Sequence, residues 1–146
     1  MVKKLFLIFI ILNFLFILAG CGNDQYSVER EYWYLQKRAK KVLLNPEASP
    51  TMQVNRIVDA LNSFAKIHPD STLVVSAEFS IANLYIVKKE FSQGRAQLQH
   101  MITKYKDSDN ICAEAYLMIG KSYELQDKWP SALEQYRKIM RDYTET

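Results

Sequence analysis

The chain has 146 residues, of which 49% are hydrophobic and 24% charged, a balance typical of a globular protein and unlike a disordered or collagen-like one. Once Lys3 and Lys4 are set aside with the leader described below, the 19 basic and 16 acidic residues come close to balance, which argues against a nucleic-acid partner. Two cysteines exclude a disulfide framework, and four glycines and four prolines argue against a turn-rich β-sandwich.

The chain opens with a basic and then apolar segment. Lys3 and Lys4 precede residues 5–18, in which Asn13 is the single polar residue. This length fits the apolar region of a signal peptide and falls short of the roughly 20 apolar residues that a spanning helix needs. The alternative is an uncleaved N-terminal membrane anchor, which the short apolar run disfavours. Residues 1–20 are therefore expected to be a signal peptide.

The four residues after the apolar run, Leu18-Ala19-Gly20-Cys21, resemble the lipobox of bacterial lipoproteins at every position. The resemblance implies that the signal peptidase recognises Leu18, Ala19 and Gly20, and that Cys21 becomes the first residue and carries covalent lipid. Several acyl chains on one residue give stable membrane anchoring. Gly22, in place of the Asp that favours inner-membrane retention, points by the same resemblance to an outer-membrane location facing the periplasm.

The segment after the anchor is polar and lacks helical periodicity, so residues 21–28 are expected to form a lipidated tether. The folded domain would then cover residues 29–146. Its first helix is predicted over residues 29–44. Two interpretations stay open for the basic run on this helix, a solvated face or contact with anionic lipid headgroups. The run consists of Lys37, Arg38, Lys40 and Lys41.

The folded part repeats itself at an offset of 38 residues, as Ile81-Ala82 and Ile119-Gly120 illustrate. Within each unit a small residue is followed three positions later by tyrosine, and apolar residues then recur at helical spacing. Each unit is therefore predicted to be two helices, joined by turns at residues 88–90 and 126–128. The apolar or small matches pair Ile81, Ala82, Tyr85, Phe91, Leu98, Met101, Ile102 and Tyr105 with Ile119, Gly120, Tyr123, Trp129, Tyr136, Ile139, Met140 and Tyr143.

This pattern resembles the tetratricopeptide repeat, in which helix A carries an apolar–small pair followed by an aromatic residue, and helix B begins with a small residue. The resemblance implies an all-α helix-turn-helix solenoid of about three repeats, in units of about 29–71, 75–108 and 113–146. Glu78 departs from it, because a large apolar residue is usual there. The matching positions are Ile81, Ala82, Tyr85, Gly94 and Leu98 in one unit, and Tyr116, Ile119, Gly120, Tyr123, Ala132 and Tyr136 in the next.

The leader and the repeats together are similar to a group of periplasmic repeat lipoproteins, among them BamD of outer-membrane protein assembly and the Tol-Pal-associated coordinator of envelope constriction. In such arrays the A helices line a groove that suits an extended or helical peptide segment. The alternative for Phe79 and Leu117 is packing between neighbouring A helices. The resemblance places eight residues in the groove: Trp33, Gln36, Phe79, Asn83, Ile86, Leu117, Lys121 and Glu124.

No residue pattern indicates catalysis or metal binding. His68 and His100 have no cysteine or carboxylate cluster at ligand spacing, and His68 is expected to end a helix before Pro69. Cys112 is expected to be a small buried residue, with a redox role as the alternative. No cofactor is expected beyond the lipid on Cys21.

The sequence thus favours a membrane-anchored, non-catalytic scaffold that binds envelope proteins, with outer-membrane protein assembly as one pathway. The alternatives are an adaptor of the cell-division or peptidoglycan machinery, and the non-catalytic part of a longer envelope hydrolase. Tyr123, Tyr136 and Met140 are expected near an open apolar flank of the last unit, which further repeats, a partner or a second copy would cover.

Overall fold

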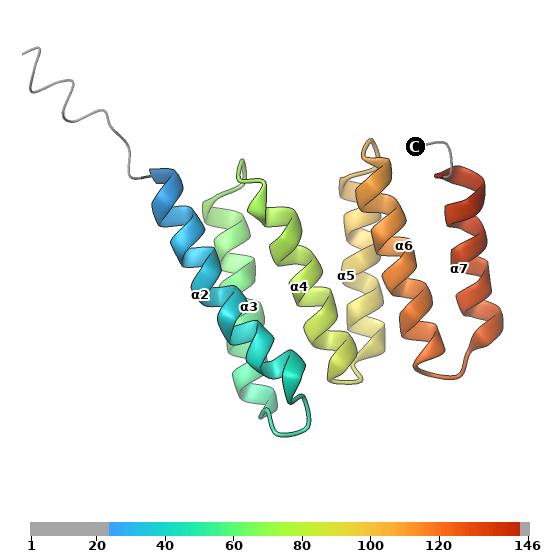
Figure 1. Cartoon of the computed structure of the whole chain (residues 1–146), viewed down its shortest axis with the longest axis horizontal. Coiled ribbons are helices and arrows are strands. Elements are labelled where there is room, and N and C mark those ends of the chain that lie inside the picture. The colour runs from blue at the N-terminus through green and yellow to red at the C-terminus, as the bar shows by residue number, and fades with distance from the viewer. Residues whose placement is uncertain (1–23, 144–146) are drawn as a thin grey trace, which may run out of the picture. The chain divides into compact units, whose positions relative to one another are not determined.

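A computed structural model describes residues 24–143, and this part of the chain is entirely helical apart from its turns (Figure 1). Leu18, Ala19, Gly20 and Cys21 lie outside the described residues. None of the described helices is long and apolar enough to cross a membrane. The helices are α2 (Asp24–Leu44), α3 (Thr51–Ile67), α4 (Leu73–Val87), α5 (Phe91–Lys104), α6 (Asp109–Glu124) and α7 (Trp129–Asp142).

The chain divides into two units, Met1–Glu31 and Tyr32–Thr146. In the second unit the helices form antiparallel pairs that follow one another along the array, with α3 and α5 behind α2, α4 and α6 in the view of Figure 1. The described part of this unit is a helical repeat array in which α2, α4 and α6 are A helices and α3, α5 and α7 are B helices. The expected fold class is confirmed.

Helix α2 begins earlier than the sequence predicts, at Asp24 rather than at Glu29, so residues 24–28 are helical and not an irregular tether. Side chains four residues apart support this first turn. The Gln25 amide donates to Glu29 Oε1 at 3.1 Å, and the Arg30 guanidinium lies 5.7 Å from the centre of the Tyr26 ring. Such pairs stabilise a helix without giving it an apolar stripe, so periodicity could not detect this turn.

The turns between the A and B helices lie where the repeat register predicts them. Lys89 and Asp127, which are 38 residues apart, have φ angles of 64° and 57° and are the only non-glycine residues with positive φ in the described part. Lys88 Nζ donates to the carbonyl oxygens of Pro46 and Ser49 at 2.8 and 3.0 Å. This lysine therefore fastens the long turn of the first helix pair to the turn of the second.

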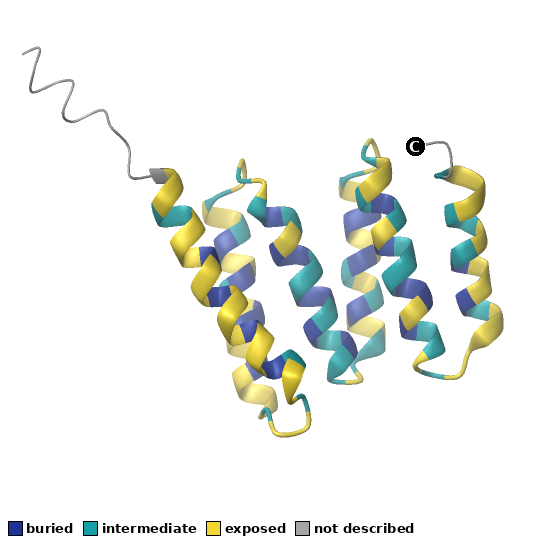
Figure 2. Ribbon diagram, viewed as in Figure 1, coloured by how far each residue is buried: buried dark blue, intermediate teal, exposed yellow. Residues whose placement is uncertain are grey.

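The core contains the residues that the apolar periodicity predicts (Figure 2). Phe64, Leu61 and Ile57 of α3 are fully buried, and Tyr32 of α2 lies against Phe64 with ring centres 5.5 Å apart. The expected inward residues of α2 are also buried, with Leu35 7%, Ala39 2% and Val42 0% exposed. Further along the array, Leu98 and Met101 of α5 and Cys112, Ala115 and Ile119 of α6 share one cluster.

Small residues allow each A helix to approach its B helix. A Cβ added at Gly94 would lie 2.7 Å from Cγ1 of Ile86, and one added at Gly120 would lie 2.7 Å from Cζ of Tyr136. The expected close crossing at Gly120 is therefore confirmed. The preceding repeat has a different pair of residues at this crossing. Ala82 holds the position of Gly120 there, and Leu98 holds the position of Tyr136.

The last helix is the least covered of the array. Only Ala132 and Gln135 of α7 are buried, while Trp129, Leu133 and Met140 are 56%, 51% and 61% exposed (Figure 2). The expected position of Tyr123 on this flank is wrong, because its ring packs on the α5 side beneath the Arg95 guanidinium, at 4.3 Å. Tyr136 likewise faces back toward Gly120. Of the three residues expected there, Met140 alone is exposed.

Candidate interaction surfaces

The expected groove residues lie on three successive A helices at helical spacing. Gln36 and Lys121 are exposed, and the Trp33 ring is 50% exposed with Lys37 Nζ 4.8 Å from its centre. Asn83, Leu117 and Glu124 are partly exposed. The A helices thus carry a mixed apolar and polar surface at these residues.

Ile86 does not belong to that surface. It is 7% exposed, and Cγ1 of its side chain faces Gly94 of α5 in the core cluster. In the repeat pattern Ile86 lies one helical turn beyond Asn83. Its side chain turns toward the core because Gly94 has no side chain to occupy that place. Phe79 also packs against this cluster with part of its surface, as the packing alternative predicts, whereas Leu117 is outside it.

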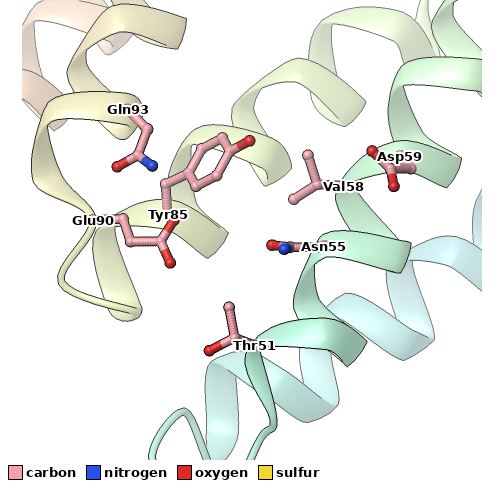
Figure 3. Close-up of a pocket in the computed structure, with 7 residues that line it drawn as sticks. All are labelled: Thr51, Asn55, Val58, Asp59, Tyr85, Glu90 and Gln93. Carbon is pink, nitrogen blue, oxygen red and sulfur yellow. The ribbon is translucent and has the colours of Figure 1, made fainter.

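A cavity of about 420 Å³ lies on the other side of the array, where the B helices α3 and α5 flank the end of α4. Thr51, Asn55, Val58 and Asp59 of α3 form one wall, Glu90 and Gln93 the opposite wall, and the Tyr85 ring lies between them (Figure 3). Burial raises the pKa of Tyr85 above its ordinary value of 10.0, and the charges of Glu90 and Asp59 raise it further. The cavity therefore combines an aromatic ring with two carboxylates.

A second cavity, of about 380 Å³, lies between α5 and α7. Tyr123 of α6 lines it, as Tyr85 of α4 lines the first cavity. Its charged lining residues are basic, namely Arg95 and Lys138. Besides covering the Tyr123 ring, Arg95 donates to Ser122 Oγ at 3.2 Å, which fixes the guanidinium at this place.

Sequence reasoning missed both cavities. It assigned Tyr85 and Tyr123 as repeat aromatics and placed Tyr123 on the open flank, and it gave no binding role to Asp59, Glu90 or Arg95. The available signal was the register itself, since the two tyrosines are 38 residues apart and each follows its small residue by three positions. The repeat register does not predict the contact between successive B helices. That contact brings together side chains from α3 and α5.

A buried ionic group explains the presence of Glu78 at a position where the repeat pattern usually has an apolar residue. Glu78 is 6% exposed and accepts hydrogen bonds from Lys104 Nζ at 2.8 Å and from the Tyr105 hydroxyl at 2.7 Å. Burial alone would lower the pKa of Lys104, but hydrogen bonding and charge interactions with Glu78 and Tyr105 together outweigh burial, and the pKa is raised. This glutamate therefore joins α4 to the end of α5 and is part of the packing.

The histidines and the thiol form no reactive set in the described part of the chain. His68 caps the end of α3, with its ring centre 5.0 Å from that of Phe64, and His100 is exposed on α5. Cys112 is fully buried as expected, with Sγ 3.2 Å from the Tyr105 carbonyl oxygen, and burial raises its thiol pKa. Among residues 24–143 no group of three or more His, Cys, Asp or Glu side chains could hold a metal ion.

Comparison with known protein families identifies the last helix pair. The tetratricopeptide repeat model matches residues 114–146, which include most of α6 and all of α7. This helix pair is similar to a tetratricopeptide repeat. No curated protein and no solved structure matches the chain. Together with the helical array, the match shows an all-α repeat solenoid of the tetratricopeptide type, and such repeats indicate an adaptor that binds other proteins.

Proposed function

We propose that the protein is a lipid-anchored, non-catalytic adaptor of the bacterial cell envelope, acting in outer-membrane protein assembly. Lipid on Cys21 would hold it at the outer membrane facing the periplasm, and the A-helix surface would bind envelope proteins or their peptide segments. The observation that carries the proposal is the occurrence of a tetratricopeptide repeat in the same chain as the Leu18-Ala19-Gly20-Cys21 pattern. Confinement to a membrane surface raises the effective concentration of partners there.

The A-helix surface has the chemistry that a peptide segment requires. Trp33 and Leu117 offer apolar contact area, while Gln36, Asn83 and Lys121 offer hydrogen-bonding groups between these apolar side chains. Tryptophan is favoured at protein interfaces because it combines a large apolar surface with a polar N–H. The helices hold these side chains in a fixed order, so less conformational entropy is lost on binding.

Metabolic labelling with a fatty acid tests the anchor. Replacing Cys21 by Ser should abolish the label and leave an uncleaved precursor, because the thiol is the atom that takes the lipid. Cys112→Ser is the matched control and should keep the label, since Cys112 is buried in the repeat array. A Cys21→Ser protein labelled as strongly as the parent would refute the anchor.

Site-specific photocrosslinking in intact cells tests the groove. A photoreactive residue at Lys121 should crosslink an envelope protein, which mass spectrometry would identify. The same residue at Lys106, exposed in the turn between α5 and α6, is the control and should not. Identical products from both positions, or none from Lys121, would contradict binding at the A-helix surface. Products from the division or peptidoglycan machinery would replace the proposed pathway by that one.

A further inference from the structure

The two cavities on the B-helix side occupy equivalent places in successive repeats. Each has a tyrosine of an A helix in its lining, Tyr85 in the first and Tyr123 in the second, and B helices on both sides. Helix α5 contributes to both, with Gln93, and Glu90 just before the helix, next to the first cavity and residues such as Arg95 next to the second. The array thus presents two adjoining hollows separated by one helix.

The two cavities carry opposite charge. Asp59 and Glu90 line the first, which has no lysine or arginine among its lining residues within the described part. In residues 24–143 neither carboxylate forms an ion pair. Arg95 and Lys138 line the second, which has no acidic lining residue; Lys138 pairs at 3.3 Å with Glu134, which lies outside the cavity lining. The first cavity therefore suits a cation beside an aromatic ring, and the second an anion.

The distance between the cavities suits an extended chain. The helix that separates them is about 10–12 Å across with its side chains. In the polyproline II conformation an extended polypeptide advances about 3.1 Å per residue and repeats every three residues, so side chains three positions apart point to the same side and lie about 9 Å apart, close to the width of this helix. A cavity of 420 Å³ has room for a lysine or arginine side chain, and one of 380 Å³ for a carboxylate side chain.

We propose that this surface binds an extended segment of a partner protein in which a basic and an acidic residue stand about three positions apart. The basic side chain enters the Asp59–Glu90 cavity beside Tyr85, and the acidic side chain meets Arg95 and Lys138 in the next cavity. The site lies on the B-helix side of the array and is distinct from the A-helix groove. It gives the adaptor a second binding surface, with its own charge-based specificity.

Binding of short synthetic peptides tests the proposal. The full chain in mild detergent would be titrated into fluorescent nine-residue peptides with blocked ends, carrying Lys and Glu three positions apart in both orders. One of the two orders should bind at least about fivefold more tightly than a peptide with both charges replaced by Gln, an effect of the size that two partly exposed ion pairs supply. Salt should weaken this binding.

Charge-neutral variants assign each cavity. Asp59→Asn combined with Glu90→Gln should remove the preference for the peptide's Lys, and Arg95→Gln combined with Lys138→Gln the preference for its Glu. Glu114→Gln, an exposed change on α6 outside both cavities, is the control and should leave affinity unchanged. Equal affinity for charged and neutral peptides, or the same loss in the Glu114→Gln control, overturns the proposal. Neither result bears on crosslinking from Lys121, so failure here and failure of the A-helix groove are distinguishable.

Discussion

Ile102 and Met140 hold equivalent positions in the successive B helices α5 and α7, yet Ile102 is 9% exposed and Met140 is 61% exposed. Ile102 is covered because α6 packs against α5. The same relation holds about three turns earlier in each helix, where Trp129 is 56% exposed and its counterpart Phe91 is packed against the core cluster. No described helix covers α7 as α6 covers α5.

Self-association through the α7 face is the first prediction. Sedimentation of the chain from residue 22 onward at low micromolar concentration should show a species larger than the monomer, because Leu133 and Met140 expose apolar side chains on a helix that no described helix covers. Leu133→Lys combined with Met140→Lys should restore the monomer without lowering the denaturation midpoint. A well-folded monomer of the parent that binds no apolar dye would contradict this prediction.

The second prediction concerns the crossing of α6 and α7. Gly120→Leu should lower stability by about 1–3 kcal/mol or more, because a side chain here would meet the Tyr136 ring. Lys128→Leu is an exposed change just before α7 and should have little effect. Urea denaturation measures both variants, and equal midpoints would show that the two helices do not cross at Gly120.

A compensating pair sharpens this test. Gly120→Ala alone should destabilise the protein, whereas Gly120→Ala with Tyr136→Leu should recover part of the loss, since it copies the Ala82 and Leu98 pair of the preceding repeat. A double-mutant cycle gives the coupling free energy directly. Strict additivity of the two single changes would mean that Gly120 and Tyr136 do not share the same space.

Sequence-based prediction succeeded where the apolar periodicity determines the structure and failed where other features of the chain determine it. The apolar stripes gave the helix pairs, the turns near Lys89 and Asp127 and the close approach at Gly120, because each depends on residues of one repeat. The helical turn at residues 24–28 escaped because it rests on polar pairs. Ile86 was misplaced because its direction depends on the missing side chain at Gly94.

The cavities could not be predicted for a related reason. They form between successive B helices, where Asp59 of α3 meets Glu90 near the start of α5 across the Tyr85 ring. A single sequence shows that a residue is polar and where it lies on its helix. It does not show which polar residue of a neighbouring helix lies opposite, because that depends on how far each repeat is rotated against the next.

Removal of the buried carboxylate is the third prediction. Glu78→Ala should lower stability by about 1–3 kcal/mol, because it leaves a cavity and removes the hydrogen bonds of Lys104 and Tyr105. Glu78→Leu should cost less, since an apolar side chain of similar volume fits the usual repeat pattern and Lys104 remains 42% exposed to water. Thermal denaturation compares the two, with the exposed Glu114→Ala as control. A larger loss for Leu than for Ala would contradict this expectation and show that the site between α4 and α5 does not accept an apolar side chain of this volume.

The last prediction concerns alkaline pH. Burial raises the pKa of Cys112 above its ordinary value of 9.0 and that of Tyr105 above 10.0, with the Glu78 hydrogen bond raising the latter further. A group whose pKa is higher in the folded state holds its proton more tightly there. Its contribution to stability is therefore complete below the unfolded pKa and is lost as the pH rises through the folded pKa.

The free energy of unfolding should accordingly begin to fall near pH 9 and fall further above pH 10, where the phenol titrates. Urea denaturation at intervals between pH 7 and 11 measures the curve, in concentrated buffer so that ionic strength stays constant. Tyr105→Phe should make the fall above pH 10 shallower without removing it, because the pKa values of Tyr85, Tyr136 and Tyr143 are raised as well, while the loss above pH 9 that belongs to Cys112 remains. A curve that is level up to pH 11, or one that Tyr105→Phe leaves unchanged above pH 10, would show that the hydroxyl beside Glu78 does not couple folding to protonation.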